Sequence, residues 1–210
     1  MSYVLYGANG SGSSIVEAAL AEIGVDYTLN PVDMAKAAQR DAAYASINPH
    51  RKVPTLLGPE NETLTESVAI VLTLAERHPD AGLLPPIASR ERARALRWML
   101  FAATELYPII EIVDYPDRFA PDEASKLGVR EVALANWRSR WSTVEQGLSE
   151  GPFVLGDEFC IADIYLAVLS RWDLSSEWRA ANIPKVERLA VAVAQRPRLQ
   201  ELWRRHFGPR

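Results

Sequence analysis

The loop at residues 7–14 combines small residues with three hydroxyl groups, at a position where a strand is expected to give way to a helix. It reads Gly7-Ala8-Asn9-Gly10-Ser11-Gly12-Ser13-Ser14. A β-favouring run at residues 3–6 precedes it, and residues 15–23 carry apolar side chains at helical spacing. Because backbone N–H groups are free at a helix start and the helix dipole is positive there, the sequence predicts an anion-binding loop.

Several kinds of loop can be compared with these residues. A nucleotide phosphate loop would match Gly7, Gly12 and Ser14. It also needs a lysine, and Ser13 stands at that position. A dinucleotide-binding fingerprint would need a third glycine where Ile15 stands. Two interpretations remain open: a thiolate held by a hydroxyl and the helix start, or a capped turn that binds no ligand.

A second pair of motifs lies further along the chain. Residues 48–56 read Asn-Pro-His-Arg-Lys-Val-Pro-Thr-Leu, and Glu66-Ser67-Val68-Ala69-Ile70 begins ten residues after them. Together they resemble the two adjoining motifs of the glutathione transferase superfamily, in which the Val-Pro bond is cis. The resemblance implies an α/β N-terminal thioredoxin-like domain that binds glutathione, followed by an all-α helical domain that binds a second substrate.

The resemblance also implies how glutathione is held. The backbone N–H and C=O of Val53, before Pro54, would pair with the cysteinyl backbone as an added strand does. The hydroxyl and N–H of Ser67 would bind the γ-glutamyl carboxylate, and Glu66 would face the ammonium group. Ordinary helix capping is the alternative explanation for these last two residues. The candidates for a contact with the glycyl carboxylate are Arg51 and Lys52.

A hydroxyl at the helix start could keep glutathione ionised. A thiol with a pKa near ~8.5 is only about 3% thiolate at pH 7, and lowering the pKa by about two units makes it roughly three quarters thiolate. By its position after the strand and Gly10, Ser11 matches the active serine of theta-like and delta-like members. This loop has no cysteine, which disfavours disulfide exchange through an enzyme cysteine. The other candidates for activating the thiol are Asn9, Ser13, Ser14 and Tyr6.

The resemblance continues in the second half of the chain. Residues 159–164 resemble the family's helix-capping box, with Cys160 at the cap position and Asp163 three residues later. Because a thiol accepts hydrogen bonds weakly, we expect a half-present box and a buried, unreactive Cys160. Residues 183–197 resemble the family's penultimate helix and its exit.

A pocket for an apolar electrophile would lie in the helical part. All six tryptophans occur there, and residues 98–119 correspond to the helix and turn that face the glutathione domain in the family. Pro108 is expected to kink that helix. Core packing is the alternative for any aromatic side chain at helical spacing. The candidates for lining the pocket are Tyr107, Tyr115 and Trp172.

A proline-containing segment separates the elements that must position these residues. We expect a thioredoxin-like domain at residues 1–78, a linker at 79–89 and a helical domain at 90–210. The first domain should hold strands at 3–6, 26–30, 55–57 and 63–64 and helices at 15–23, 36–46 and 67–77. The second should hold helices near 90–113, 122–149, 161–172, 184–195 and 198–205.

Composition limits the other classes of function. The 210 residues are 48% hydrophobic and carry a net charge of −4 with both signs interspersed, which leaves no basic face for nucleic acid. No apolar run reaches the ~18 residues of a membrane span. His50 has no second histidine at metal spacing, and His78 and His206 are expected at the surface, so we expect no metal site. With a single cysteine and no export signal, we expect a cytoplasmic protein.

The sequence as a whole predicts a glutathione transferase that activates the thiol of glutathione for attack on a small apolar electrophile, as in detoxification. A homodimer is expected, as is common in the family. Two alternatives stay open. One is a related glutathione-dependent isomerase, dehalogenase, peroxidase or ether-cleaving enzyme, and the other is a non-catalytic glutathione-binding regulatory module.

Overall fold

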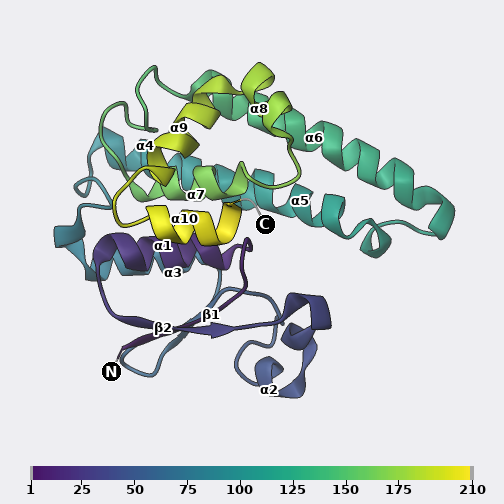
Figure 1. The fold of residues 1–210 in the computed structure, drawn as a ribbon, viewed down its shortest axis with the longest axis horizontal. Coiled ribbons are helices and arrows are strands. Elements are labelled where there is room, and N and C mark those ends of the chain that lie inside the picture. The colour runs from purple at the N-terminus through teal and green to yellow at the C-terminus, as the bar shows by residue number, and fades with distance from the viewer. Residues whose placement is uncertain (1, 209–210) are drawn as a thin grey trace. The chain divides into compact units, whose positions relative to one another are not determined.

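The structure, a computed structural model, describes residues 2–208 and divides them into two compact units. The first comprises the described parts of Met1–Leu84 and Ala194–Arg210, and the second is Pro85–Val193 (Figure 1). The break at Leu84 falls inside the segment expected to be a linker. Residues 194–208, which the sequence assigned to the helical domain, instead pack with the first unit.

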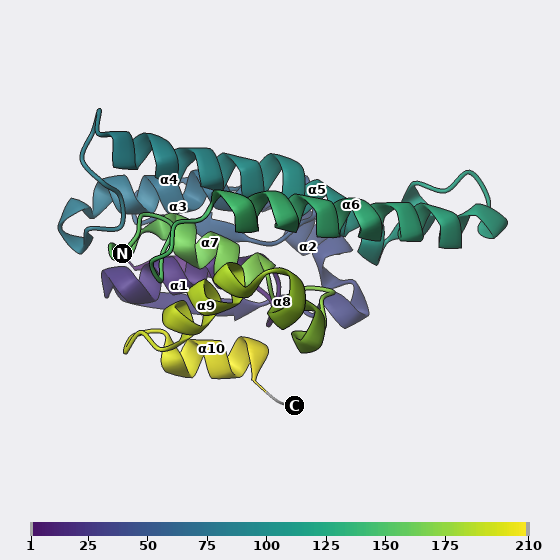
Figure 2. The ribbon, with the colours of Figure 1, turned by 90° about the horizontal axis from the view of Figure 1, so that it is seen from above.

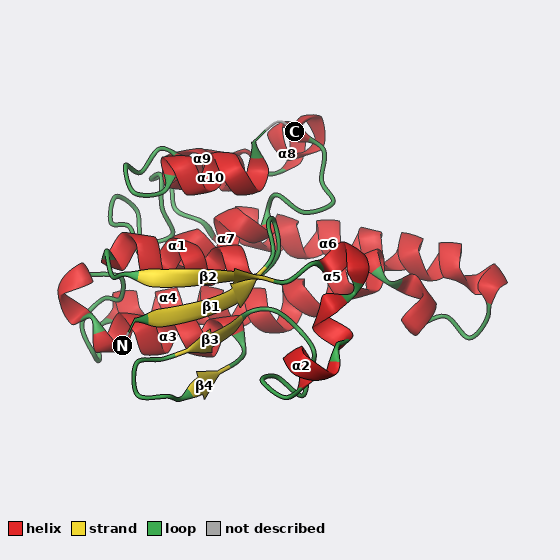
Figure 3. Ribbon diagram, turned by 60° about the horizontal axis from the view of Figure 1, so that its bottom comes forward, coloured by secondary structure: helices red, strands yellow, loops and turns green. Residues whose placement is uncertain are grey.

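A four-stranded sheet forms the centre of the first unit (Figure 3). Its order is β2-β1-β3-β4, from β2 (Tyr27–Pro31), β1 (Tyr3–Gly7), β3 (Thr55–Leu57) and β4 (Thr63–Leu64). β1 runs parallel to β2, whereas β3 is antiparallel to both β1 and β4. The end of β1, the start of β3 and the end of β4 therefore meet at one edge of the sheet.

Two helices, α1 (Ser13–Ile23) and α3 (Ser67–Arg77), pack against each other on one face of this sheet (Figure 3). Their apolar stripes and the inward side chains of the strands form the core. The fully buried members include Leu5, Leu20, Leu56, Ile70 and Leu74. This arrangement confirms the thioredoxin-like fold that was predicted for the N-terminal part.

The alanine-rich segment at 36–46 does not form the single helix that was expected. It consists of two short 3₁₀ turns, Met34–Lys36 and Ala38–Arg40, followed by a single turn of α-helix, α2 (Ala42–Ala45). Ala37 adopts a left-handed conformation with φ of 55° and separates the two turns. A left-handed residue cannot continue a right-handed helix, so the propensity of alanine is overridden here.

The second unit is helical, apart from one isolated bridge between Phe153 and Gly156. Two of its helices, α5 (Tyr107–Asp114) and α6 (Lys126–Gly147), run side by side (Figure 2). The expected helix at 90–113 is interrupted by a π-helical turn at Ala102–Leu106. This turn comes directly before Pro108, which has no N–H to donate. The helices are α4 (Arg90–Phe101), α5 (Tyr107–Asp114), α6 (Lys126–Gly147), α7 (Ile161–Leu169), α8 (Ser176–Asn182) and α9 (Pro184–Ala194).

Every residue of α7 is buried, and its start is capped more completely than the sequence predicted. The Asp163 carboxylate accepts from the N–H of Cys160 at 2.7 Å and from the N–H of Val154 at 2.6 Å. The Cys160 side chain in turn accepts from the backbone N–H of Asp163, so both halves of the capping box are present. Burial and the nearby Asp163 charge raise the pKa of the Cys160 thiol, as expected for an unreactive cysteine.

Replacing this carboxylate tests its contribution to the helical unit. Asp163→Ala should lower the free energy of unfolding by about 2–4 kcal/mol, because two buried N–H groups lose their acceptor. Urea unfolding measures the change. Asp122→Ala is the control, since exposed Asp122 caps a 3₁₀ turn, and it should cost at most about 1 kcal/mol. If both variants lose the same free energy of unfolding, the buried capping box stabilises the protein no more than the exposed cap at Asp122 does.

Candidate functional site

The candidate site lies at the edge of the sheet where β1 and β4 end and β3 begins. Along β1, β3 and β4, Leu5, Leu56 and Leu64 lie opposite one another in the register. One position nearer the edge, Tyr6 lies opposite Thr55. Beyond that row come the loop at 7–12, the segment ending at Val53–Pro54, and the start of α3. The strand directions thus bring together three motifs that are far apart in the sequence.

The loop at 7–12 leads into α1, and its hydroxyls differ in accessibility. Ser13 and Ser14 are almost fully buried, whereas Ser11 is half-buried. The Ser13 hydroxyl accepts from the N–H of Ala8 at 3.0 Å and lies 2.8 Å from the hydroxyl of Ser11. The Ser11 hydroxyl donates to the carbonyl of Ala8 at 2.8 Å. Of the three serines, Ser11 is therefore the most exposed residue at the helix start.

The other two candidates for thiol activation flank this turn. The Asn9 side chain is exposed. Tyr6 is half-buried, and its ring meets the ring of Tyr44 edge-on, with 5.9 Å between the ring centroids. Tyr6 therefore has a packing partner at the end of β1.

The Val53–Pro54 peptide bond is cis, as the resemblance implied. A buried polar cluster supports the segment before it. The Asn48 amide donates to the carbonyl of Lys52 at 2.8 Å and to the Thr55 hydroxyl at 3.0 Å. The Tyr44 hydroxyl donates to the same carbonyl at 2.7 Å. These bonds fix the backbone on both sides of Val53, whose side chain is half-buried.

The side chains predicted to contact the glycyl carboxylate belong to this same segment. Arg51 and Lys52 are both exposed, and Arg51 has a φ of 55° in the left-handed region. Its N–H donates to the carbonyl of Asn48 at 2.9 Å, which closes a turn. The turn directs the chain back toward β3.

At the start of α3, Glu66 is exposed and Ser67 is buried. Glu66 has a φ of 63° and a ψ of 106°, an unusual conformation for a residue with a side chain. Its side chain makes no capping hydrogen bond to the helix, so ordinary capping does not account for this residue. Unusual backbone conformations of this kind concentrate at ligand-binding sites.

The comparisons with known proteins agree with this geometry. Residues 1–76 match the model of the glutathione S-transferase N-terminal domain. The GST-like protein YncG of Escherichia coli strain K12 is 31% identical over 206 residues, which cover 96% of this chain and 97% of YncG. This chain belongs to the glutathione transferase superfamily. Glutathione S-transferase GstA of Escherichia coli O157:H7 is also 31% identical, over 87% of this chain and 88% of GstA.

A solved glutathione transferase structure extends the likeness to the fold of the whole chain. The glutathione transferase homologue from Sulfitobacter, crystallised with bound glutathione, superimposes with a TM-score of 0.89 at 26% identity. The match covers 98% of this chain and 99% of that one. The two-part fold predicted from the sequence is therefore confirmed.

The helical unit of this glutathione transferase family member holds the three aromatic residues predicted to line an electrophile pocket. The rings of Tyr107 and Trp172 meet edge-on, with 5.3 Å between centroids, and both are half-buried. Tyr115 is 40% exposed, and the guanidinium of Arg118 lies over its ring at 3.8 Å. The structure thus brings two of the three together, while the third pairs with an arginine.

The first unit also contains a residue whose position the sequence analysis predicted wrongly. His206 was expected at the surface, but it is only 8% exposed, and its Nδ1 accepts from the N–H of Gly10 at 3.0 Å. The reason is packing of the C-terminal helix α10 (Gln200–Phe207) along α1, which buries the imidazole. No local motif marks such a contact between residues 196 positions apart.

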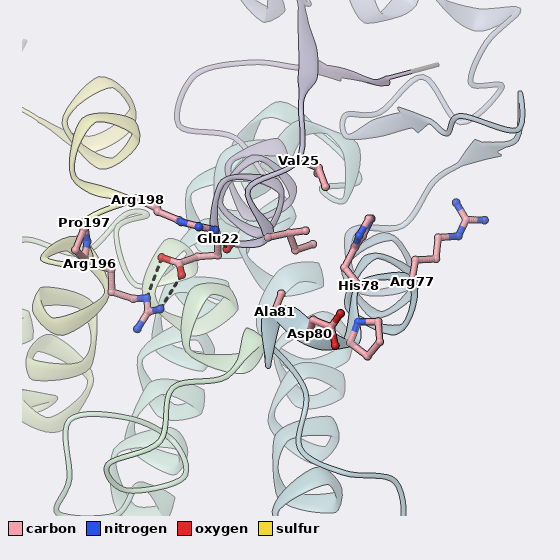
Figure 4. Close-up of a pocket in the computed structure, with 11 residues that line it drawn as sticks. Glu22, Val25, Arg77, His78, Asp80, Ala81, Arg196, Pro197 and Arg198 are labelled. Atoms are coloured by element: carbon pink, nitrogen blue, oxygen red, sulfur yellow. Dashed lines mark hydrogen bonds and ion pairs between the residues drawn. The ribbon is translucent and has the colours of Figure 1, made fainter.

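The first unit also has a hollow away from this edge. It has a volume of about 620 Å³ and lies where α1 and α3 end, and charged side chains line much of it (Figure 4). Within residues 2–208, no three His, Cys, Asp or Glu side chains gather as metal ligands would. None of the helices in that range is both long enough and apolar enough to cross a membrane.

The buried Asn48 offers a test of how the cis-proline segment is held. Asn48→Ala should lower the free energy of unfolding by about 1–3 kcal/mol, because the Lys52 carbonyl and Thr55 hydroxyl lose a buried donor. Chemical denaturation measures this loss. Asn182→Ala is the control, since Asn182 donates to Trp178 at an exposed helix end and should matter little. A loss no larger than the control's would rule out the supporting role.

Proposed function

We propose that this protein binds glutathione at this edge of the sheet and activates its thiol for attack on a small apolar electrophile. The observation that carries the proposal is the half-buried residue Ser11 just before α1, at the same sheet edge as Val53 and Ser67. Glutathione is a co-substrate in this scheme. The scheme needs no metal.

The tripeptide would be held mainly by backbone groups and short side chains. The N–H and C=O of Val53 would pair with its cysteinyl backbone in the manner of an added strand. Ser67, at the positive end of the α3 dipole, would bind the γ-glutamyl carboxylate, and exposed Glu66 would face the ammonium group. Arg51 or Lys52 would reach the glycyl carboxylate from the exposed turn before Pro54.

Thiolate formation would depend on Ser11 and the start of α1. A hydroxyl that donates to sulfur stabilises the anion, and the α1 N-terminus adds a favourable dipole. Without ligand, this hydroxyl donates to the Ala8 carbonyl, so it must turn from that acceptor toward the sulfur when glutathione binds. Ser13 and Ser14 would then serve the loop itself, because their buried hydroxyls already bond within the first unit.

The chemical step follows from this ionisation. The thiol loses its proton to solvent, and the sulfur lone pair then forms a carbon–sulfur bond with the electrophile. Either a leaving group departs with its bonding pair, or the π bond of an activated double bond breaks and the other carbon takes a proton from solvent. The edge-on pair of Tyr107 and Trp172 would provide apolar surface for that substrate, with Tyr115 nearby in the chain. We further propose a homodimer with a role in detoxification, as the family resemblance implied, and a cytoplasmic location, which fits the single cysteine.

Two alanine variants separate binding from activation. Ser11→Ala should raise the pKa of the bound glutathione thiol toward its free value near ~8.5, because the thiolate loses a donor. Bound glutathione should still be detected in this variant. The measurement is the near-ultraviolet thiolate absorbance of the complex from pH 5 to 9. Ser46→Ala is the control, since Ser46 is an exposed serine that donates to the backbone of α2.

Ser67→Ala should have the opposite pattern. It should weaken glutathione binding at least about tenfold by removing a charge-assisted hydrogen bond, with little change in the pKa of whatever glutathione is bound. Calorimetric titration measures the affinity. If Ser67→Ala changed ionisation and Ser11→Ala changed affinity, both roles would be misassigned. Glutathione bound with an unshifted thiol in the wild type would favour a binding module over an enzyme.

A further inference from the structure

We infer that His206 is a positioning residue for the loop at 7–12, called here the glutathione loop. From the C-terminal helix α10, its side chain accepts a hydrogen bond from the N–H of Gly10. The inference rests on the proposed function, because it concerns the loop that carries Ser11. Figure 1 shows α10, in yellow, lying along α1, in purple, and both belong to the first unit. The residues that join them form a buried polar network between α10, α1 and β2.

The hydrogen bonds of His206 define which of its nitrogens carries the proton. The N–H of Gly10 donates to Nδ1 at 3.0 Å, so Nδ1 is the unprotonated nitrogen. The Ser14 hydroxyl, 3.1 Å away, can therefore only donate to it. The other nitrogen, Nε2, lies 2.8 Å from the Glu17 carboxylate and supplies its proton to that bond. One side of the imidazole thus holds the loop and the other side is anchored on α1.

Glu17 is the anchor of this network. Its side chain is 1% exposed, and it accepts from Tyr27 at 2.9 Å, from Arg205 and from His206. Burial by itself raises the pKa of Glu17, but the bonds from His206 and Arg205, with the charge of Arg205, hold that pKa below its ordinary value. The same carboxylate and burial raise the pKa of Tyr27 to about 12. A buried carboxylate is costly unless it is paired, so α1 requires its partners from α10.

Gly10 links the buried network to Ser11, because it is the residue directly before Ser11 in the loop. It has a φ of 70°, and a Cβ there would lie 3.5 Å from the His206 carbonyl, so the loop backbone passes close to α10. In the turn at residues 8–11, which contains Gly10, the N–H and the hydroxyl of Ser11 both donate to the Ala8 carbonyl, at 3.2 and 2.8 Å. Fixing the N–H of Gly10 therefore fixes the residue directly before the proposed thiol-activating serine.

A second attachment of the C-terminal segment provides the matched control. Arg196 forms a two-fold contact with the Glu22 carboxylate, at 2.9 and 2.7 Å (Figure 4). Glu22 is buried in the last turns of α1, at the opposite end from the loop. Both pairs join the same two segments through a buried carboxylate of α1. Only the His206 pair also contacts the glutathione loop.

Two conservative variants separate the two sides of the imidazole. Asparagine can place its amide oxygen where Nδ1 lies, so His206→Asn keeps an acceptor for Gly10 and loses the bond to Glu17. Glutamine extends toward Glu17 instead, so His206→Gln keeps that bond and loses the acceptor for Gly10. If His206 positions the loop, His206→Gln should raise the pKa of bound glutathione by at least about one unit, and His206→Asn should not. The thiolate absorbance of each complex gives this value.

Steady-state kinetics with a chromogenic aryl halide give a second measure. His206→Gln should lower kcat about tenfold or more with little change in the KM for glutathione, as expected when an activating group is misplaced but binding is retained. Arg196→Gln should lower stability in urea without changing kcat or the thiol pKa. If the asparagine and glutamine variants behave alike, or if Arg196→Gln changes the thiol as much as His206→Gln, the inference is wrong.

Hydrogen exchange of the Gly10 amide, measured by NMR without glutathione, keeps this inference distinct from the proposed function. His206→Gln should accelerate this exchange about tenfold or more, whereas His206→Asn and Arg196→Gln should leave it close to the wild-type rate. If wild-type protein leaves the glutathione thiol unshifted, the proposed function fails. In that case the exchange rate of the Gly10 amide alone decides whether His206 positions the loop. Equal exchange rates in all variants would overturn the inference about His206.

Discussion

The antiparallel pairing of β1 with β3 is the constraint on which the candidate site depends. With Tyr6 opposite Thr55, the chain leaves the sheet after β1 at the point where it enters the sheet before β3. β4, antiparallel to β3, then delivers the start of α3 to the same edge. A shift of this register by one residue would turn either Leu5 or Leu56 out of the core and would displace the loop at 7–12 relative to Val53. Core packing and site geometry are therefore set by one pairing.

Around this edge of the sheet, buried polar side chains hold the backbone in place through hydrogen bonds. Asn48 and Tyr44 support the segment before Pro54, and His206 meets the loop before α1. Each of these side chains is buried and fully engaged with backbone or side-chain partners. Such supports narrow the range of positions that the groups facing a ligand can occupy. The site therefore has two groups of residues: those that would contact glutathione, and the buried residues that hold the first group in place.

The sequence predicted the parts of the molecule whose signals are local. Val53-Pro54 and Glu66-Ser67 each mark a backbone geometry within a few residues, and α3 begins and ends where its apolar pattern predicted, at Ser67 and Arg77. Features that depend on packing between distant segments could not be predicted from the sequence. The alanine-rich segment was broken by the left-handed Ala37, and α8 was not anticipated. The burial of Ser14 beside His206 depends on α10, whose contacts with α1 no periodicity reveals.

The first unit is built from both ends of the chain, which has a consequence for the order in which it can mature during synthesis. The strands and α1 leave the ribosome before the entire second unit is made. Until residues 196–206 follow, Glu17 and Glu22 lack the arginines that neutralise them in the folded protein, and Glu17 also lacks its hydrogen bond from His206. A nascent thioredoxin-like domain would therefore carry two uncompensated acidic groups on α1. The loop at 7–12 would reach its final form only after residues 196–206 have been made.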